Sequence, residues 1–267
     1  MTIKRKAILI ASPFAKIEIP PPEPVWGVKN DIIAWENFLI DPMGGSWNPE
    51  TEIINGSNYT VQDLENAISS LDGMQDYIFF VYSGHGFAQS RNENFIILGH
   101  GTEYIPIETV RDWLYKKTER GTMIIDACRQ GKPSSIQSGV SFQIKKNERL
   151  DESYLQPSRT LWEDEFEQSK TTTGIVTIQS CGFGQKSYML GNNQFSVFSW
   201  FLNRGFRSSK QWLTVGDAFS IADAWTKKET QSWITPVKQD PECDNPLAAY
   251  PFCLEHTVSL ASQYFDI

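Results

Sequence analysis

Runs of consecutive apolar residues alternate with amphipathic stretches along the first half of the chain. Residues 7–11, 77–82 and 122–125 are almost entirely apolar, as is typical of strands buried on both faces of a parallel sheet. Apolar residues also recur at helical spacing from Val28 to Leu39, which predicts an amphipathic helix. The alternating order predicts a doubly wound, mainly parallel α/β sheet.

Other segments continue this alternation of strands and helices. Thr60 lies three positions before Asp63, a spacing at which a threonine and an acidic residue can cap a helix reciprocally, so we expect a helix through residues 68–71. The remaining expected strands are 52–55, 95–98, 103–105, 174–179 and 247–254, and the remaining expected helices are 107–116, 195–202 and 215–227.

The periodic pattern lapses between residues 132 and 172. This stretch is rich in Ser, Gln, Lys and Glu, and it is too long for an ordinary connection between two elements. We therefore expect a flexible loop here, within a single domain that spans residues 1–267.

Composition and charge narrow the range of functions. Of the 267 residues, 40% are hydrophobic and 21% are charged, so the chain can bury enough apolar surface to fold. The 24 basic and 32 acidic residues give a net charge of −8, and an acidic field repels phosphate groups, so nucleic acid and membranes are not expected partners. No apolar run approaches the ~20 residues of a membrane span, and no signal peptide is recognisable. We expect a cytoplasmic protein.

Two residues of the chain form a candidate catalytic pair. His85 and Cys128 each follow a predicted strand, and ligands of open α/β sheets bind at the carboxyl ends of the strands. A thiolate is a nucleophile, and a nearby imidazole can take its proton or stabilise its charge. The four cysteines and three histidines show neither a disulfide framework nor the spacing of a zinc module.

The motifs around these two residues resemble those of a known family. Residues 82–86 are Tyr-Ser-Gly-His-Gly and residues 126–131 are Asp-Ala-Cys-Arg-Gln-Gly, similar to the Ala-Cys-x-Gly signature of caspases except for one extra residue before the glycine. The chain resembles the caspase-like cysteine peptidases (clan CD, peptidase C14 type) over nearly its whole length, and within them the metacaspases and bacterial orthocaspases. The resemblance implies a caspase-like α/β fold, with a mainly parallel sheet of about six strands and helices on both faces.

The resemblance also implies roles for individual residues. Cys128 would attack the scissile carbonyl, and His85 would protonate the leaving amine and then activate the deacylating water. The backbone N–H groups of Gly86 and Cys128 would hold the oxyanion. In metacaspases the primary pocket is lined by residues that match Asp31, Ser83 and Asp126 here.

These pocket residues predict the substrate class. Caspases, which cut after aspartate, carry a glutamine two positions before the nucleophile, where this chain has Asp126. A carboxylate there repels an acidic side chain and attracts Arg or Lys, so we expect a protein or peptide substrate cut after a basic residue. The alternative interpretations are a helix cap for Asp126, a solvated loop charge for Asp31 and a turn residue for Ser83.

Members of the family also cut themselves after the catalytic cysteine and often need calcium. The basic residues available for such a cut here are Lys145, Lys146, Arg149, Arg159 and Lys170. The acidic run at residues 163–165, with Asp151 and Glu152, does not follow a recognisable calcium-loop spacing. We interpret it as part of a solvated linker, and we expect no required cofactor.

Two functions from different classes remain open. The first is an endopeptidase with a Cys/His dyad, activated by a small molecule or a partner protein in a bacterial defence or cell-death pathway. The second is a catalytically silent caspase-fold module that acts through protein contacts. The presence of both His85 and Cys128 favours the peptidase, because a silent module needs neither.

Overall fold

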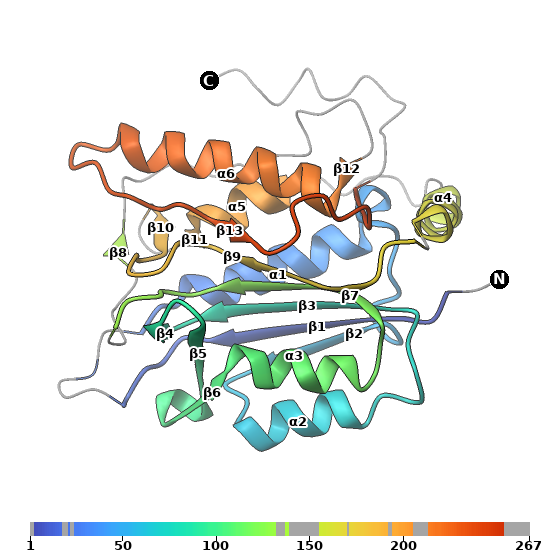
Figure 1. Ribbon diagram of the computed structural model, residues 1–267, viewed down its shortest axis with the longest axis horizontal. Coiled ribbons are helices and arrows are strands. Elements are labelled where there is room, and N and C mark those ends of the chain that lie inside the picture. Colours follow the sequence, from blue (N-terminus) through green and yellow to red (C-terminus); the bar gives the residue numbers. More distant parts are fainter. Residues whose placement is uncertain are drawn as a thin grey trace.

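A six-stranded sheet runs through the centre of the protein (Figure 1). The computed structural model describes residues 3–17, 21, 24–131, 137–138, 155–169, 171–191, 194–204 and 213–253. Five strands are parallel and the edge strand β13 is antiparallel to β9. The strands, in spatial order, are β13 (Glu242–Cys243), β9 (Gly174–Gln179), β7 (Arg120–Asp126), β3 (Tyr77–Gly84), β1 (Arg5–Ser12) and β2 (Ile53–Ser57).

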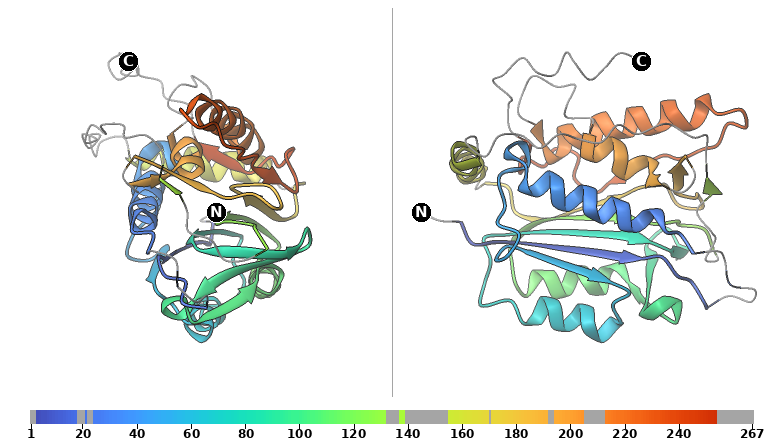
Figure 2. Two further views of the ribbon diagram at one scale, coloured as in Figure 1. Left: turned by 90° about the vertical axis from the view of Figure 1, so that its left-hand side faces the viewer. Right: turned by 180° about the vertical axis from the view of Figure 1, so that it is seen from behind.

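Helices cover both faces of this sheet (Figures 1 and 2). One face carries α1 (Gly27–Ile40), α4 (Leu155–Gln168), α5 (Val197–Arg204) and α6 (Val215–Ser232), whose apolar residues share one core with the sheet. The other face carries α2 (Val61–Ser69) and α3 (Ile107–Tyr115). The expected α/β class, with about six mainly parallel strands, is confirmed. No helix in the described ranges is long and apolar enough to span a bilayer.

Most of the short strands gather at the carboxyl ends of the parallel strands, whereas β12 (Leu213–Thr214) lies near the opposite end (Figure 1). A hairpin and its neighbour form one small sheet, and two further small sheets lie on the α5 and α6 side. These strands are β4 (Gly86–Ser90), β5 (Glu93–Leu98) and β6 (Glu103–Pro106), then β8 (Gln137–Ser138), β10 (Tyr188–Leu190) and β11 (Phe195–Ser196), then β12 (Leu213–Thr214) and β14 (Pro251–Cys253). The described residues also contain two 3-10 turns, η1 (Pro42–Gly44) and η2 (Gly99–Gly101).

The helix start predicted at Thr60 is confirmed. The Thr60 hydroxyl accepts a hydrogen bond from the Asp63 N–H at 3.0 Å, and the Asp63 carboxylate accepts one from the Thr60 N–H at 2.9 Å. Thr214 and Asp217 form the same reciprocal cap on α6. Each pair satisfies backbone donors that a helix start otherwise leaves without partners.

Three sequence expectations are wrong in detail. Helix α4 lies inside 132–172, where we expected only loop; Trp162 and Phe166 are its buried residues among the side chains described from residue 159 onward. The strand expected at 247–254 is the shorter β14, which pairs with β12 rather than with the central sheet. The helix expected from residue 195 begins at Val197, after the short strand β11.

A buried arginine at the amino-terminal end of β1 links α4 to the sheet. The Arg5 guanidinium lies between the rings of Trp47 and Trp162, 4.4 and 4.7 Å from their centroids, and its Nε pairs with Glu52 at 3.3 Å. Glu52 also accepts from Arg159 on α4 at 2.6 Å. Arg159 is therefore held within a helix by an ion pair and is not part of the flexible loop that the sequence led us to expect for residues 132–172. The other four basic residues considered for self-cleavage lie outside the described residues.

Candidate active site

His85 and Cys128 follow two strands that are neighbours in the central sheet. β3 ends at Gly84 and β7 ends at Asp126, and their parallel register pairs Ser83 with Asp126. Because the two strands run in the same direction, both residues leave the sheet at its carboxyl edge, the usual ligand-binding edge of such sheets. The topology brings together the two residues selected from the sequence.

The hairpin that begins after His85 packs directly on the segment that carries Cys128. A Cβ atom on Gly86 would lie 2.8 Å from the Cβ of Ala127 and 3.1 Å from the carbonyl oxygen of Cys128. The first of these distances is shorter than real side chains show, so only glycine permits this approach. Gly86 therefore sets how closely the histidine segment meets the cysteine segment.

The N–H of Gly86 is directed out of its hairpin. Gly86 lies opposite Ile96 in the antiparallel β4–β5 pair, and the Ile97 N–H donates to the His85 carbonyl at 3.1 Å. This pattern makes Gly86 and Ile96 a non-hydrogen-bonded pair, whose own N–H groups take no part in the ladder. The Gly86 amide can therefore serve a group outside the hairpin.

The His85 side chain is fully buried and has a fixed orientation. Its Nε2 lies 3.1 Å from the carbonyl oxygen of Pro13, and its own carbonyl accepts from the Tyr82 hydroxyl at 2.7 Å. Because a carbonyl oxygen can only accept, this contact places the proton of a neutral imidazole on Nε2 and leaves Nδ1 as the basic nitrogen. The histidine is thus preset as a base through Nδ1.

The Cys128 thiol is closed to solvent by the segment around Ser187. Cys128 is 1% exposed, and its Sγ donates to the Ser187 carbonyl at 3.8 Å. The covering segment is held by two backbone bonds of 2.9 Å to Arg129, one from the Arg129 N–H to Gln185 and one from the Gly184 N–H to Arg129. The structure is therefore a closed form of the site.

Two buried carboxylates lie beside this pair. Asp31 and Asp126 are each 1% exposed. Asp31 accepts from the Ser83 hydroxyl at 2.7 Å and from the Ser196 N–H at 2.9 Å. Burial excludes the solvated loop charge considered for Asp31, and Ser83 is a strand residue bonded to that carboxylate rather than a turn residue.

Asp126 is held by hydroxyl groups from two other segments. It accepts from the Ser187 hydroxyl at 2.8 Å, and from both the N–H and the hydroxyl of Ser199. Asp126 ends a strand, so the interpretation as a helix cap is also wrong. The three residues expected to line the primary pocket therefore lie together: Ser83 bonds Asp31 and is the register partner of Asp126 on the neighbouring strand.

The pKa of Asp31 is raised well above its ordinary value. Burial is the main cause, and the nearby charge of Asp126 adds to it, while the hydrogen bonds from Ser83 and Ser196 act in the opposite direction. Two acidic groups that share a dry site cannot both ionise without cost. A cation placed between them would remove that cost.

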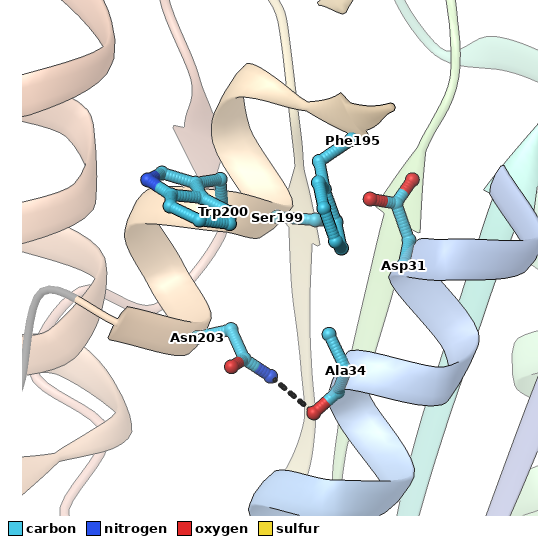
Figure 3. Close-up of a pocket in the computed structure, with 6 residues that line it drawn as sticks. All are labelled: Asp31, Ala34, Phe195, Ser199, Trp200 and Asn203. Carbon is cyan, nitrogen blue, oxygen red and sulfur yellow. Dashed lines mark hydrogen bonds between the residues drawn. The ribbon is translucent and has the colours of Figure 1, made fainter. Parts of the chain in front are cut away.

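A small pocket opens beside Asp31, between α1 and α5 (Figure 3). The Asn203 side chain donates to the Ala34 carbonyl at 3.0 Å and joins the two helices at one end of the pocket. The ring of Phe195 packs on Trp200, with 5.0 Å between centroids. The lining residues are Asp31, Ala34, Phe195, Ser199, Trp200 and Asn203.

Three of the serines that hold the carboxylates, Ser187, Ser196 and Ser199, were not identified as site residues from the sequence. Ser187 lies in a stretch without periodic apolar residues, whereas Ser196 and Ser199 are three positions apart where β11 leads into α5. Ser196 acts through its backbone N–H, which no side-chain pattern reveals, and Ser199 acts through both its N–H and its hydroxyl. No pattern in the sequence points to Ser187.

The other three cysteines are not disulfide-bonded, and burial raises the pKa of each thiol. The Cys181 thiol donates to the Ala127 carbonyl at 3.3 Å, next to the nucleophile segment. Burial raises the pKa of Cys243 to about 11 and that of Cys253 to about 12. Thiols with such pKa values are poor nucleophiles at neutral pH.

The described residues contain no group of three or more His, Cys, Asp or Glu side chains arranged to hold a metal ion. In the acidic run, Glu163 pairs with Arg159 along α4 at 3.1 Å. Asp151 and Glu152 lie outside the described residues.

Comparison with known proteins identifies the family. The model of the caspase domain (peptidase C14) matches residues 4–247, so this chain belongs to the caspase-domain family and is a caspase-type cysteine peptidase domain. Among solved structures, caspase-1 from Spodoptera frugiperda is similar, with a TM-score of 0.57 and 11% identity over 91% of this chain and 86% of that chain. At that identity the likeness shows the fold alone. A search of curated proteins finds no match.

Proposed function

We propose that this protein is a cysteine endopeptidase that cleaves peptide bonds after Arg or Lys, with Cys128 as nucleophile and His85 as acid–base group. The observation that carries the proposal is the buried pair Asp31 and Asp126 beside the dyad. In the described part of the chain, the hydrogen bonds to these carboxylates come from neutral hydroxyl and amide donors. A basic side chain of the substrate would supply the missing positive charge.

The contact between the two loops supports the chemistry. His85 would receive the thiol proton at Nδ1, since Nε2 is directed at the Pro13 carbonyl. The thiolate would then attack the carbonyl carbon, and the amide of Gly86, directed out of its hairpin, would stabilise the developing oxyanion together with the Cys128 amide. His85 would give its proton to the leaving amine and then activate the water that releases the acyl group.

The closed site implies an opening step before catalysis. Cys128, His85, Asp31 and Asp126 are all at most 1% exposed, so a peptide cannot reach them in this form. The covering segment near Ser187 must move, and that movement is where an activating small molecule or partner protein would act. We assign this step to signal control in a cytoplasmic metacaspase-like or orthocaspase-like enzyme, in a defence or cell-death pathway.

The proposal is tested with matched peptides that differ only in the residue before the scissile bond: Arg, Lys or Asp. Wild type, Cys128→Ala and His85→Ala are compared, with and without calcium, and Cys243→Ala serves as the control thiol because Cys243 lies on the edge strand β13. We expect cleavage of the Arg and Lys peptides by wild type and Cys243→Ala only. Cleavage of the Asp peptide alone would contradict the specificity.

The alternative function, a silent caspase-fold interaction module, makes the opposite prediction. Such a module would cut none of the three peptides under any condition. It would also leave Cys128 unlabelled by a chloromethyl ketone that carries an arginyl side chain, because that probe reacts with a catalytic cysteine held beside a basic pocket. Labelling at Cys128 without peptide turnover would indicate an enzyme that lacks its activator.

A further inference from the structure

Arg129, the residue after the nucleophile, is a buried cation. It is 3% exposed, and four hydrogen bonds from its guanidinium reach three separate segments. The planar fork of arginine can hold several acceptors at fixed angles, which the single ammonium of lysine cannot do. Such a side chain, next to a nucleophile, fixes the relative positions of the segments that it bonds.

One side of the guanidinium holds the β4–β5 hairpin. Nε donates to the Asn94 side-chain oxygen at 3.0 Å, and Nη2 donates to the Arg91 carbonyl at 3.2 Å. The Asn94 amide donates to the same carbonyl at 3.1 Å. Both the turn and the second strand of the hairpin are therefore fixed to the residue next to Cys128.

A backbone bond joins the same two segments closer to the histidine. The Ala88 N–H donates to the Gln130 carbonyl at 2.9 Å, and Ala88 lies opposite Asn94 in the hairpin. His85 is the residue directly before this hairpin. The hairpin thus carries one member of the dyad at its base and is held by the neighbour of the other member.

The other side of the guanidinium reaches the central sheet. Nη1 donates to the Cys181 carbonyl at 3.0 Å, just beyond β9, and also pairs with Glu242 on β13. These contacts keep Arg129 from following the hairpin if the hairpin moves. The sheet is the fixed frame against which the hairpin is held.

We propose that Arg129 is a positioning residue for the dyad: its guanidinium holds the hairpin that begins after His85 against the sheet edge that carries Cys128. This inference rests on the proposed peptidase function. Asp31 and Asp126 are held by serines of other segments, so loss of the Arg129 contacts should disturb the chemical step and leave binding of the basic side chain intact.

The test compares Arg129→Lys, Asn94→Ala and Asn94→Asp with wild type. Arg129→Lys keeps the charge and loses the fork, whereas Asn94→Ala keeps Arg129 and removes the acceptor of its Nε together with the Asn94 bond to the Arg91 carbonyl. We expect kcat for the arginyl peptide to fall by about ten- to a hundredfold in both, with KM unchanged, as small misplacements of catalytic groups do. Asn94→Asp keeps the acceptor and should restore kcat to within about threefold of wild type.

Arg111→Lys is the matched control. Arg111 lies on α3 and forms ion pairs with Glu108 and Asp244. Its substitution should leave kcat unchanged. The inference is overturned if Asn94→Ala keeps the wild-type kcat, or if KM rises in step with the loss of kcat. Failure of Arg129→Lys to fold leaves the two Asn94 variants to decide.

A second measurement separates this inference from the proposed function. If wild type cleaves no peptide, the proposed function fails, and hydrogen exchange at the Ala88 amide then tests the contact itself. We expect that amide, which bonds to the Gln130 carbonyl, to exchange at least tenfold faster in Asn94→Ala than in Arg111→Lys. Equal exchange in the two variants would overturn the inference.

Discussion

The carboxyl group of Asp31 on α1 lies close enough to that of Asp126 at the end of β7 for the charge of Asp126 to help raise its pKa. The two residues are 95 positions apart in the chain, and both are buried. Natural proteins rarely keep two acids in one dry place unless a partner neutralises them. Removing one of the two charges should therefore stabilise the fold.

Asp31→Asn should stabilise the fold and impair cleavage. Folding raises the pKa of this carboxyl, so the native state becomes less stable as pH rises above the unfolded pKa of about 3.9. At neutral pH the ionisation of Asp31 therefore lowers the free energy of unfolding. Asparagine can still accept from the Ser196 N–H and contact Ser83. We expect the Tm at pH 7 to rise by about 2 °C or more, while kcat/KM for the arginyl peptide falls at least about tenfold. A lower Tm would contradict the assignment.

Binding of a basic peptide should release protons. Burial and the nearby charge of Asp126 raise the pKa of Asp31 in the free protein, whereas an incoming guanidinium favours the ionised form. Affinity should therefore increase as pH rises through the Asp31 pKa. Calorimetry with the Cys128→Ala protein, in buffers of different ionisation enthalpy, measures the protons released. The double variant with Asp31→Asn should release none from this group.

Gly86→Ala should inactivate the enzyme by separating the two loops. The added Cβ would meet the Ala127 Cβ and the Phe95 carbonyl, each at 2.8 Å, and backbone atoms cannot move aside as a flexible side chain can. We expect kcat to fall at least about a hundredfold. Gly131→Ala is the matched control, because its Cβ would have the Ala88 carbonyl at 3.9 Å as its nearest contact. Similar losses of kcat in both variants would show that the close approach at Gly86 does not position the catalytic residues.

Glu52→Gln should weaken the fold and change its response to acid. Burial acts to raise the pKa of Glu52, but the charge of Arg5 and hydrogen bonds from Asn48 and Arg159 outweigh it and leave the pKa lowered. The ionised form thus stabilises the protein above the unfolded pKa of about 4.3, and this contribution disappears as pH falls through the folded pKa.

The measurement is thermal unfolding between about pH 3 and 7. At pH 7 we expect Glu52→Gln to cost about 3 kcal/mol, because it leaves the buried Arg5 without its counter-charge. The difference from wild type should shrink towards pH 3. Glu108→Gln, at an exposed ion pair with Arg111, should change stability by less than about 1 kcal/mol. A constant difference at all pH values would exclude the ion pair as its source.

The strong apolar runs and the dyad could be predicted from the sequence because both are local signals. Buried parallel strands need consecutive apolar residues, and the catalytic motifs are short and follow those strands. The family and the fold are confirmed on this basis. The roles assigned to Cys128, His85 and Gly86 stay predictions, although the structure brings all three together.

Long-range contacts could not be predicted in the same way. Ser187 holds Asp126 across 61 positions, and Arg129 pairs with Glu242 across 113. A lone serine or arginine carries no sign in the sequence of which distant group it will meet. Helix α4 was missed for a related reason, since its helical pattern depends on two aromatic residues among polar neighbours.

The contacts of Arg5 with Trp47, Trp162 and Glu52 determine how a cleaved form of this protein would behave. Arg159, on the far side of residues 139–154, is bonded through Glu52 to the first strand, and β9 lies between β7 and β13 in the sheet. A chain cut after Lys145, Lys146 or Arg149 would consist of two polypeptides, neither with a complete sheet. It would keep the hydrodynamic radius and elution volume of the intact protein and would separate into two bands only after denaturation.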